Sequence, residues 1–378
     1  MKKSVCIGIL GGGQLARMSA SAAYRLGCSV AILEKEKYSP AGQLTHNEFI
    51  GWVHDDTLLK QFAATCDAIT LENEFVDFHR IEFLESLGKP VFPSSYTISH
   101  IQDKLIQKET LERNNIPVPR FIKVDSHTTF VSIKNELGVP FILKSRKMGY
   151  DGYGNALIRT NKDFLLAHEK LSSRHASLMA EKFVHFTMEL AVMVARTKKE
   201  TVVYPVVQTI QKNHICHTVI APAQIKKRIA RIAGKIAVAS VEAVHGYGIF
   251  GVEMFLTTDG NILVNEMAPR PHNSGHYTIE ACVTSQFENH IRAVFNAPLG
   301  SAAMVQPYAV MVNLLGKKKQ SPLPETHRAV LHNNNVHLHV YGKTHSREGR
   351  KMGHITMLGT DLKTILHQTQ TIAKKISL

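Results

Sequence analysis

The first hundred residues alternate short apolar runs with a polar, helix-periodic segment. Apolar runs lie at 4–10, 29–33 and 68–72, three glycines at 11–13, and a helix-periodic stretch at 14–26. The second run ends in Glu34, and the third ends in Glu72 with Glu74 close behind. Strand, glycine turn, helix and strand in this order are typical of a βαβ unit. We therefore predict an open, Rossmann-like α/β domain over residues 1–98, with its strand ends facing a ligand.

The rest of the chain mixes helical and strand patterns, which predicts an α+β arrangement in two further units. We expect helices at 99–115 and 225–245, strands at 178–184, 188–196, 310–315 and 336–342, and a hairpin from 248–256 and 261–267 around the turn TTDG. The sequence IPVPR at 116–120 cannot continue a helix and marks a boundary. The predicted units are a central one over 99–298, with a lid at about 117–185, and a small β-rich domain over 299–378.

Two glutamates stand on the predicted hairpin. With the turn centred on TTDG, Glu253 and Glu266 lie directly opposite each other, with Cβ atoms roughly 4.5–5.5 Å apart. This register puts Val264 on the glutamate face and Asn265 on the core face. Opposed carboxylates are unfavourable unless a cation neutralises them, and Mg²⁺ bridging to phosphates does so, with the Asn265 amide as a further oxygen ligand. In another register the glutamates would instead reach solvent.

A glycine-rich polar loop follows a short strand that presents Lys144. Gly149, Gly152 and Gly154 allow the backbone to approach a phosphate, and the lysine is placed to meet its charge. A surface loop beside a solvated lysine would explain the same pattern. The turn Gly-x-Gly-x-x-Ala at 11–16, with an acidic residue after the next strand, also satisfies the dinucleotide-binding pattern. A nicotinamide-dependent oxidoreductase is therefore a second enzyme class to weigh.

Composition and charge narrow these possibilities. The 378 residues exceed what one core usually organises, and no apolar run is long enough to span a membrane. Five scattered cysteines without metal-site spacing indicate reduced thiols and a cytoplasmic protein. The net charge of +14 suits phosphorylated substrates as well as nucleic acid. No basic helix is interleaved with aromatic residues, so a nucleic-acid partner is not expected, although salt-dependent binding to unrelated duplexes would support one.

Four motifs in a fixed order resemble those of a known enzyme family. They are GGGQLARM at 11–18, GYDGYGN at 149–155, NEMAPRPHNSGH at 265–276 and GRKMGH at 349–354. Together with the lysine strand and the paired glutamates, they are similar to the 5-(carboxyamino)imidazole ribonucleotide synthases of purine biosynthesis. The resemblance covers nearly the whole chain and implies an ATP-grasp fold. It also implies a ligase that carboxylates 5-aminoimidazole ribonucleotide with ATP, Mg²⁺ and bicarbonate, forms carboxyphosphate, and is a homodimer.

The resemblance also implies a role for individual residues. ATP would be bound by Lys104, Lys144, Gly149, Tyr150, Asp151, Gly152, Tyr153, Gly154, Asn155, Glu181, Lys182, Phe183, Val184, Glu189, Gln211, Asn265 and Glu266. In this set, 149–155 would be the lid loop, 181–184 would hold the adenine edge through the backbone of an interdomain hinge, and Glu189 would accept the ribose hydroxyls. Magnesium would be held by Glu253 and Glu266.

At the other end of the site, the resemblance implies a second group of residues. Arg270, His272 and Asn273 would line the place where bicarbonate, carboxyphosphate and the substrate amine meet. The ribose phosphate would be surrounded by Gln14, Lys343, Arg350 and Lys351. A structural role for His272 and a solvated one for Lys351 are the simpler alternatives.

Two positions depart from the family pattern. Lys104 stands where arginine is frequent, which keeps the charge but loses the bidentate fork. Gln211, in QTIQ, stands where the family usually has histidine, and an amide can hydrogen-bond a nucleotide but cannot ionise. The nearest rival is another ATP-grasp enzyme, the formate-dependent glycinamide ribonucleotide transformylase, which has a similar hairpin. The motifs HNSGH and GRKMGH favour the carboxylase.

Overall fold

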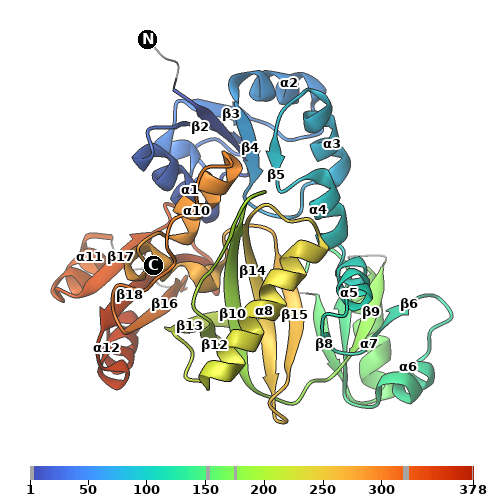
Figure 1. Ribbon diagram of the computed structural model, residues 1–378. Coiled ribbons are helices and arrows are strands. Elements are labelled where there is room, and N and C mark those ends of the chain that lie inside the picture. Colours follow the sequence, from blue (N-terminus) through green and yellow to red (C-terminus); the bar gives the residue numbers. More distant parts are fainter. Residues whose placement is uncertain (1–3, 150–153, 174–176, 318–322, 377) are drawn as a thin grey trace.

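The computed structural model describes residues 4–149, 154–173, 177–317, 323–376 and 378. The predicted residues Tyr150, Asp151, Gly152 and Tyr153 lie outside the described part of the chain. Three β-sheets, of five, four and nine strands, organise the described residues. Figure 1 shows the five-stranded sheet with its helices at one end of the molecule and the four-stranded sheet beside the long central strands.

The N-terminal sheet is parallel, as the βαβ pattern predicted. Its strands are β1 (Cys6–Leu10), β2 (Ser29–Glu34), β3 (Asn47–Ile50), β4 (Ala68–Leu71) and β5 (Val91–Phe92), in the spatial order β3-β2-β1-β4-β5. Its helices are α1 (Gln14–Arg25), α2 (Asp56–Thr65), α3 (Phe78–Ser86) and α4 (Ser95–Ile101), with the short 3₁₀ turn η1 (Gly42–Leu44). The buried runs of β1 and β2 suit a sheet that is covered on both faces.

A four-stranded antiparallel sheet lies in the segment that we predict to be a lid. Its strands are β6 (Phe121–Val124), β7 (Phe141–Ser145), β8 (Asn155–Ile158) and β9 (Leu178–Lys182), in the order β6-β9-β7-β8. Helices α6 (Phe130–Leu137) and α7 (Asn161–Ser172) pack against it around the buried rings of Phe141 and Phe164. Threonines cap both helices in capping boxes, which explains where each helix begins.

The nine-stranded antiparallel sheet runs through the centre and into the C-terminal segment. Its strands are β10 (Phe186–Arg196), β11 (Thr201–Val203), β12 (Val207–Lys212), β13 (Ile215–Ala221), β14 (Gly248–Thr257), β15 (Ile262–Ala268), β16 (Tyr308–Leu315), β17 (Val336–Val340) and β18 (Lys351–Gly359). The C-terminal strands join the central ones through the pairing of β13 with β16. One sheet therefore reaches from the predicted hairpin to the segment of Lys351.

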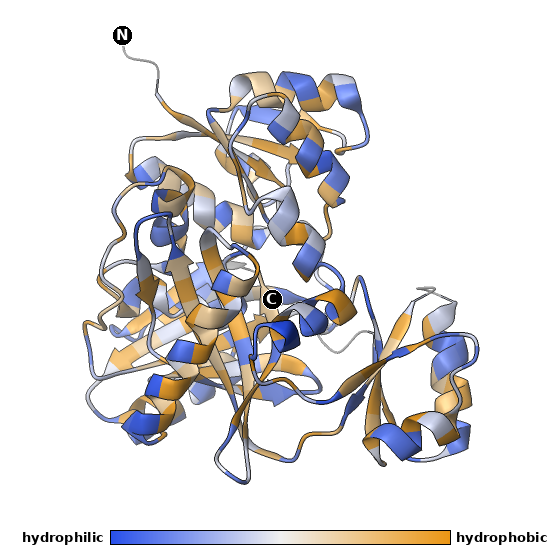
Figure 2. Cartoon of the chain, turned by 45° about the vertical axis from the view of Figure 1, so that its right-hand side comes forward, coloured by the Kyte–Doolittle hydropathy of each residue, from blue (hydrophilic) through white to orange (hydrophobic). Residues whose placement is uncertain are grey.

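The remaining helices cover this sheet. They are α5 (Lys104–Arg113), α8 (Lys227–Ala243), α9 (Thr278–Ala281), α10 (Gln286–Val294), α11 (Leu323–Leu331) and α12 (Leu362–Lys374), with the 3₁₀ turn η2 (Asn273–Gly275). Helix α10 also contacts α1, where Phe287 and Ile291 enter the core beneath the N-terminal sheet. Figure 2 shows hydrophobic residues along the strands and hydrophilic ones on the outer sides of the helices. Within the described residues, no helix is long and apolar enough to cross a membrane.

Two expectations about local structure were wrong. Residues 99–115 form two helices, because α4 ends at Ile101 and α5 begins at Lys104. Between them Asp103 is extended, and its carboxylate accepts hydrogen bonds from the first turn of α5, so a new helix begins there. The second correction concerns GRKMGH at 349–354, whose flanking glycines suggest a turn around Lys351; that residue instead begins strand β18.

Candidate active site

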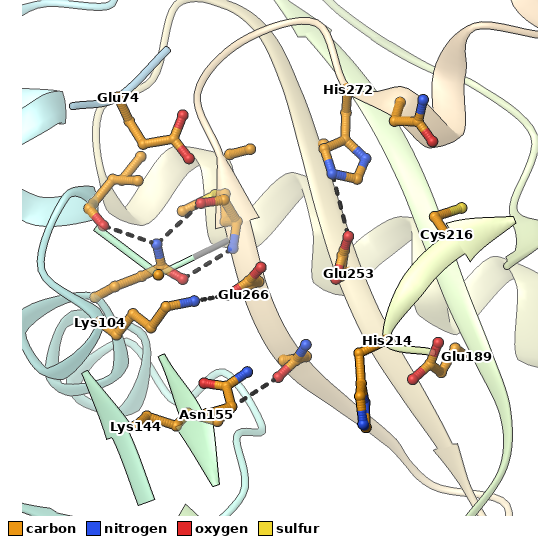
Figure 3. Close-up of a pocket in the computed structure, with 18 of the residues that line it drawn as sticks. Glu74, Lys104, Lys144, Asn155, Glu189, His214, Cys216, Glu253, Glu266 and His272 are labelled. Carbon is orange, nitrogen blue, oxygen red and sulfur yellow. Dashed lines mark hydrogen bonds and ion pairs between the residues drawn. The ribbon is translucent and has the colours of Figure 1, made fainter. Parts of the chain in front are cut away.

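A cavity of about 670 Å³ lies where the three sheets meet (Figure 3). The predicted residues that line it are Gln14, Lys104, Lys144, Gly149, Asn155, Glu181, Lys182, Phe183, Val184, Glu189, Gln211, Glu253, Asn265, Glu266, Arg270, His272, Asn273 and Lys351. They come from segments throughout the chain, and the fold brings them to one place. Lys343, Gly154 and Arg350 are described but do not line the cavity.

The hairpin of β14 and β15 places Glu253 opposite Glu266, which confirms the prediction. The register nearer the turn differs from the predicted one. Met254 pairs with Val264, and Asn265 is left as the extra residue of a β-bulge. We had placed Val264 on the glutamate face, but it belongs to the buried core. We had placed Asn265 on the core face, but the bulge lets it line the cavity beside Glu266.

The protein itself balances the charges of the two opposed carboxylates. Lys104, at the start of α5, forms an ion pair with Glu266, and His272 Nε2 lies 3.2 Å from Glu253 Oε1 (Figure 3). Burial would raise the pKa of Glu266, but the charge of Lys104 outweighs it and lowers the pKa. Burial likewise opposes the charge of Lys104, whose pKa the Glu266 carboxylate raises. Glu266 therefore faces the Lys104 ammonium and Glu253 faces the His272 imidazole, in place of each other's charge.

A buried charge cluster stands next to the hairpin. The Glu181 carboxylate on β9 lies 2.9 Å from Lys144 Nζ on β7 and 2.9 Å from Lys108 Nζ on α5. Lys144 also donates to Asn265 Oδ1 at 3.3 Å, and Lys108 donates to the carbonyl of Val264 at 3.1 Å. Burial would raise the pKa of Glu181, but the two lysines lower it, while burial lowers the pKa of Lys108 to about 8. One carboxylate thus holds two ammonium groups at the edge of the cavity.

This arrangement changes the predicted role of Glu181. We expected 181–184 to form one interdomain hinge, but Glu181 lies inside β9, paired with β6 and β7, and β9 ends at Lys182. Only Phe183, Val184 and the next residue connect β9 to β10. The carboxylate of Glu181 anchors the lysines, and the connection between the two sheets begins after Lys182.

Two backbone amides of the glycine turn before α1 are bonded to the chain's own carboxylates. Gly12 N donates to Glu34 Oε2 at 2.7 Å, and Leu15 N donates to Glu72 Oε1 at 3.3 Å. A Cβ on Gly13 would lie 2.1 Å from the same Glu72 oxygen, so glycine is needed for this carboxylate to approach. The chain's own carboxylates therefore occupy the place where a pyrophosphate would bind, which counts against the oxidoreductase.

At the end of the cavity away from the charge cluster, pairs of side chains bridge separate elements. Arg270 donates to both oxygens of Glu74, with Nη2 3.1 Å from Oε1, and this pair joins β4's end to the segment after β15. Asn273 and Asn313 exchange hydrogen bonds at 2.9 and 2.6 Å, which joins η2 to β16. The predicted catalytic residues are thus held by partners from other parts of the fold.

Only some of the residues that we predict to bind the ribose phosphate lie at the cavity. Gln14 and Lys351 line the cavity, and Lys343 supports Lys351 by donating from Nζ to its carbonyl oxygen at 2.7 Å. Arg350 Nη1 donates to the carbonyl of His345 at 2.6 Å, within its own loop. Arg350 therefore does not line the cavity with Gln14 and Lys351.

Glu189 and Gln211 meet across the pairing of β10 with β12. Burial raises the pKa of Glu189, and a hydrogen bond from Gln211 opposes this rise. The glutamine at the position where the family usually has histidine therefore orients the carboxylate that we expect to bind ribose. His214, in the turn between β12 and β13, lines the cavity close by.

Sequence reasoning missed several residues of the site. Lys108 lies one helical turn after Lys104, and this i, i+4 spacing was a usable signal, since both positions share one helix face. Asp103 and Arg146 flank the two predicted phosphate-binding lysines, and no sequence pattern links them. Asn313 lies in a buried strand, where its polarity was the one available signal.

The residues at the hairpin suit a magnesium ion shared with a nucleotide. Glu253, Glu266 and Asn265 supply carboxylate and amide oxygens, which Mg²⁺ prefers alongside phosphate oxygens. Among the described residues, no group of three or more His, Cys, Asp or Glu could hold a metal by itself. That fits an ion whose remaining ligands come from phosphates and water.

Comparisons with known proteins show which family the chain belongs to. Family models match the ribonucleotide synthetase preATP-grasp domain at residues 1–102, the ATP-grasp domain at 109–287 and the phosphoribosylaminoimidazole carboxylase C-terminal domain at 309–368. The chain is 42% identical to the phosphoribosylaminoimidazole carboxylase of Ogataea methanolica, over 99% of this chain and 71% of that protein. It is 40% identical to the N5-carboxyaminoimidazole ribonucleotide synthase of Synechococcus elongatus, over 98% of this chain and 94% of that one.

Solved structures agree with these relatives. The carboxyaminoimidazole ribonucleotide synthase of Aspergillus clavatus complexed with ATP superposes with a TM-score of 0.91 at 37% identity, covering 99% of each chain. Fold and site together define an ATP-grasp ligase. Within that class, the chain belongs to the N5-carboxyaminoimidazole ribonucleotide synthase family. It spans only 65% of the related plant carboxylase from Vigna aconitifolia.

Proposed function

We propose that this protein uses ATP to carboxylate 5-aminoimidazole ribonucleotide with bicarbonate, giving N5-carboxyaminoimidazole ribonucleotide. The observation that carries the proposal is that one cavity joins two kinds of chemistry. One end has cationic side chains and paired glutamates suited to nucleotide phosphates, and the other has Arg270, His272 and Lys351. The same fold occurs in an Aspergillus clavatus synthase in complex with ADP and 5-aminoimidazole ribonucleotide.

The nucleotide end supplies positioning and charge neutralisation, which phosphoryl transfer needs most. Lys104 and Lys144 approach the hairpin from opposite units, and ATP phosphates would replace the carboxylates as their partners. Glu189 is placed to accept the ribose hydroxyls, and 182–184 would contact the adenine between the lid and central sheets. Glu253 and Glu266, with Asn265, would hold magnesium, which reduces repulsion between the phosphates and the attacking bicarbonate.

The reaction then requires two nucleophiles to be oriented one after the other, first bicarbonate and then the substrate's amine. A bicarbonate oxygen attacks the γ-phosphorus and ADP leaves, which gives carboxyphosphate. The substrate's amine then attacks the carboxyl carbon of carboxyphosphate, or it attacks carbon dioxide that carboxyphosphate has released. In both routes inorganic phosphate leaves. Arg270 and His272 would orient the bicarbonate, Asn273 the reacting amine, and Gln14 and Lys351 the ribose phosphate. Lys343 would act through Lys351, and Arg350 would need to leave His345 in order to bind phosphate.

Two further properties belong to this proposal. The resemblance implies a homodimer, which light scattering on the purified protein would test. Five scattered cysteines without metal-site or disulfide-framework spacing suit a cytoplasmic protein, which cell fractionation would test.

The test is a phosphate-release assay with ATP, magnesium and bicarbonate, run with and without 5-aminoimidazole ribonucleotide. We expect release to require bicarbonate and to be matched by consumption of the ribonucleotide. Glycinamide ribonucleotide with formate serves as the comparison, because it is the substrate pair of the nearest rival. Faster turnover with that pair, or phosphate release that ignores bicarbonate, would contradict the proposal.

A further inference from the structure

Two predicted phosphate-binding lysines lie on separate units of the fold. Lys104 opens α5, which packs against α8 and β15 of the central unit. Lys144 stands on β7 of the lid sheet. For both ammonium groups to meet one triphosphate, the two units must be held in a fixed relation at this point.

A charged pair next to both lysines joins these units. Asp103 immediately precedes Lys104, and Arg146 follows Lys144 by two residues. The guanidinium lies side-on to the carboxylate, with Nη2 2.8 Å from Oδ2 and Nε 3.0 and 3.1 Å from the two oxygens. This bidentate geometry is strong and directional. The Asp103 side chain is only 5% exposed and that of Arg146 17%, so water screens the pair little.

Backbone hydrogen bonds also join these two units. The Lys104 amide donates to the carbonyl of Arg146 at 2.8 Å, and the Arg146 amide donates to the carbonyl of Ser177 at 3.0 Å. Asp103 Oδ1 also accepts from Leu105 N at 3.0 Å as the cap of α5. The carboxylate therefore fixes the start of the Lys104 helix and the end of the Lys144 strand at once.

We infer that Asp103 and Arg146 are positioning residues for nucleotide binding, forming a clamp that sets the separation of Lys104 and Lys144. This inference rests on the proposed function, since it takes ATP as the shared ligand. The clamp acts on the ATP end of the cavity and leaves the ribonucleotide end, around Lys351, unchanged.

The experiment compares Asp103→Ser, Arg146→Gln and the double variant in the full-length protein. Serine caps helices as well as aspartate does but is too short to reach Arg146. Asp55→Ser is the matched control, since Asp55 caps α2 through Thr57 N and Leu58 N at 2.9 and 3.0 Å. ATP binding is measured by calorimetry, and half-saturation by ATP and by the aminoimidazole ribonucleotide is measured in the phosphate-release assay.

Each single change should weaken ATP binding about tenfold, as expected for losing a charge-assisted hydrogen-bonded pair. The double variant should bind ATP about as weakly as either single one, because all three break the same clamp. Its thermal stability should recover relative to the singles, since no buried charge is left unpaired. Half-saturation by the aminoimidazole ribonucleotide should stay within about twofold, and Asp55→Ser should leave both substrates unaffected.

Three results would overturn the inference. If ATP affinity recovers together with stability in the double variant, the pair only stabilises the fold. If Arg146→Gln is much more damaging than Asp103→Ser, Arg146 contacts the nucleotide directly. If affinity for both substrates falls equally, the effect is not confined to the ATP end. Failure of the proposed function is distinguishable, because the unaltered protein would then bind ATP without consuming the aminoimidazole ribonucleotide.

Discussion

Replacing Glu181 by glutamine tests the buried charge cluster most directly. Glu181→Gln keeps the shape of the side chain but removes the one negative charge that lies 2.9 Å from both Lys108 and Lys144. The three side chains are between 3% and 9% exposed, so solvent cannot replace the lost charge. Two ammonium groups are then left facing each other in the interior.

The pKa of Lys108 sets part of the magnitude. Burial lowers it from 10.5 to about 8, and at about 1.36 kcal/mol per pH unit this corresponds to roughly 3 kcal/mol of lost unfolding free energy at neutral pH. Without Glu181 the pKa falls further and Lys108 deprotonates on folding. The cost at pH 7 then reaches a limit of roughly 5 kcal/mol, so this group adds at most about 1–2 kcal/mol.

Lys144 supplies the rest. Breaking a buried ion pair by removing one partner costs about 3–5 kcal/mol, and the remaining contact with Asn265 offsets a part of it. We therefore expect Glu181→Gln to lower the free energy of unfolding by about 2–5 kcal/mol at pH 7. The loss should shrink by up to about 1–2 kcal/mol at pH 9, where Lys108 is mostly neutral in the folded parent as well.

The assay is guanidinium denaturation followed by circular dichroism at pH 7 and pH 9. Glu169→Gln is the control, because it makes the same chemical change at an exposed position of α7 in the lid. A loss below about 1 kcal/mol at pH 7 would refute the account of a shared anchor. A loss equally large at both pH values would show that Lys108 does not titrate as its burial requires.

Three further expectations concern the metal, acid stability and the two ends of the cavity. Glu266→Gln should reduce turnover by orders of magnitude at limiting magnesium, and wild-type rates there would contradict the metal assignment. Because burial lowers the pKa of His290 to about 4, its neutral form favours folding above the ordinary value of 6.5. This stability should be lost as the pH falls from 6.5 towards 4, by up to roughly 3 kcal/mol, and His290→Gln should flatten the pH dependence measured by denaturant titration. Lys351→Ala should raise half-saturation by the aminoimidazole ribonucleotide about ten- to hundredfold and spare ATP, while Lys144→Ala should do the opposite in paired saturation curves.

The structure changes one stability expectation for the hairpin. From the sequence, two opposed glutamates repel each other, so removing one charge should leave the apo protein as stable or more so. In the fold, Lys104 pairs with Glu266 and His272 lies against Glu253. Glu266→Gln should therefore destabilise the protein without nucleotide, because it leaves the Lys104 ammonium without its carboxylate partner. Thermal melting without nucleotide distinguishes the two outcomes.

Much of this protein follows from local pattern. Alternating polarity and turn chemistry were enough to predict the hairpin and to place Glu253 opposite Glu266. Apolar runs broken by glycines predicted the parallel N-terminal sheet, since strand and helix periods are local properties. The order of four motifs predicted the family, because each motif keeps its residue types at short range.

Tertiary structure decided what each charged group does. A bulge at Asn265 shifts the register by one residue, which alternating polarity cannot specify because one extra residue costs little locally. Glu72 occupies the glycine turn, and Glu181 gathers Lys108 from 73 positions earlier in the chain. Burial and neighbouring charge set the energy of an ionisable group, and both depend on segments distant in sequence. The sequence by itself therefore determined which elements and which chemistry are present, and only the packing of three sheets decided which cation faces which carboxylate.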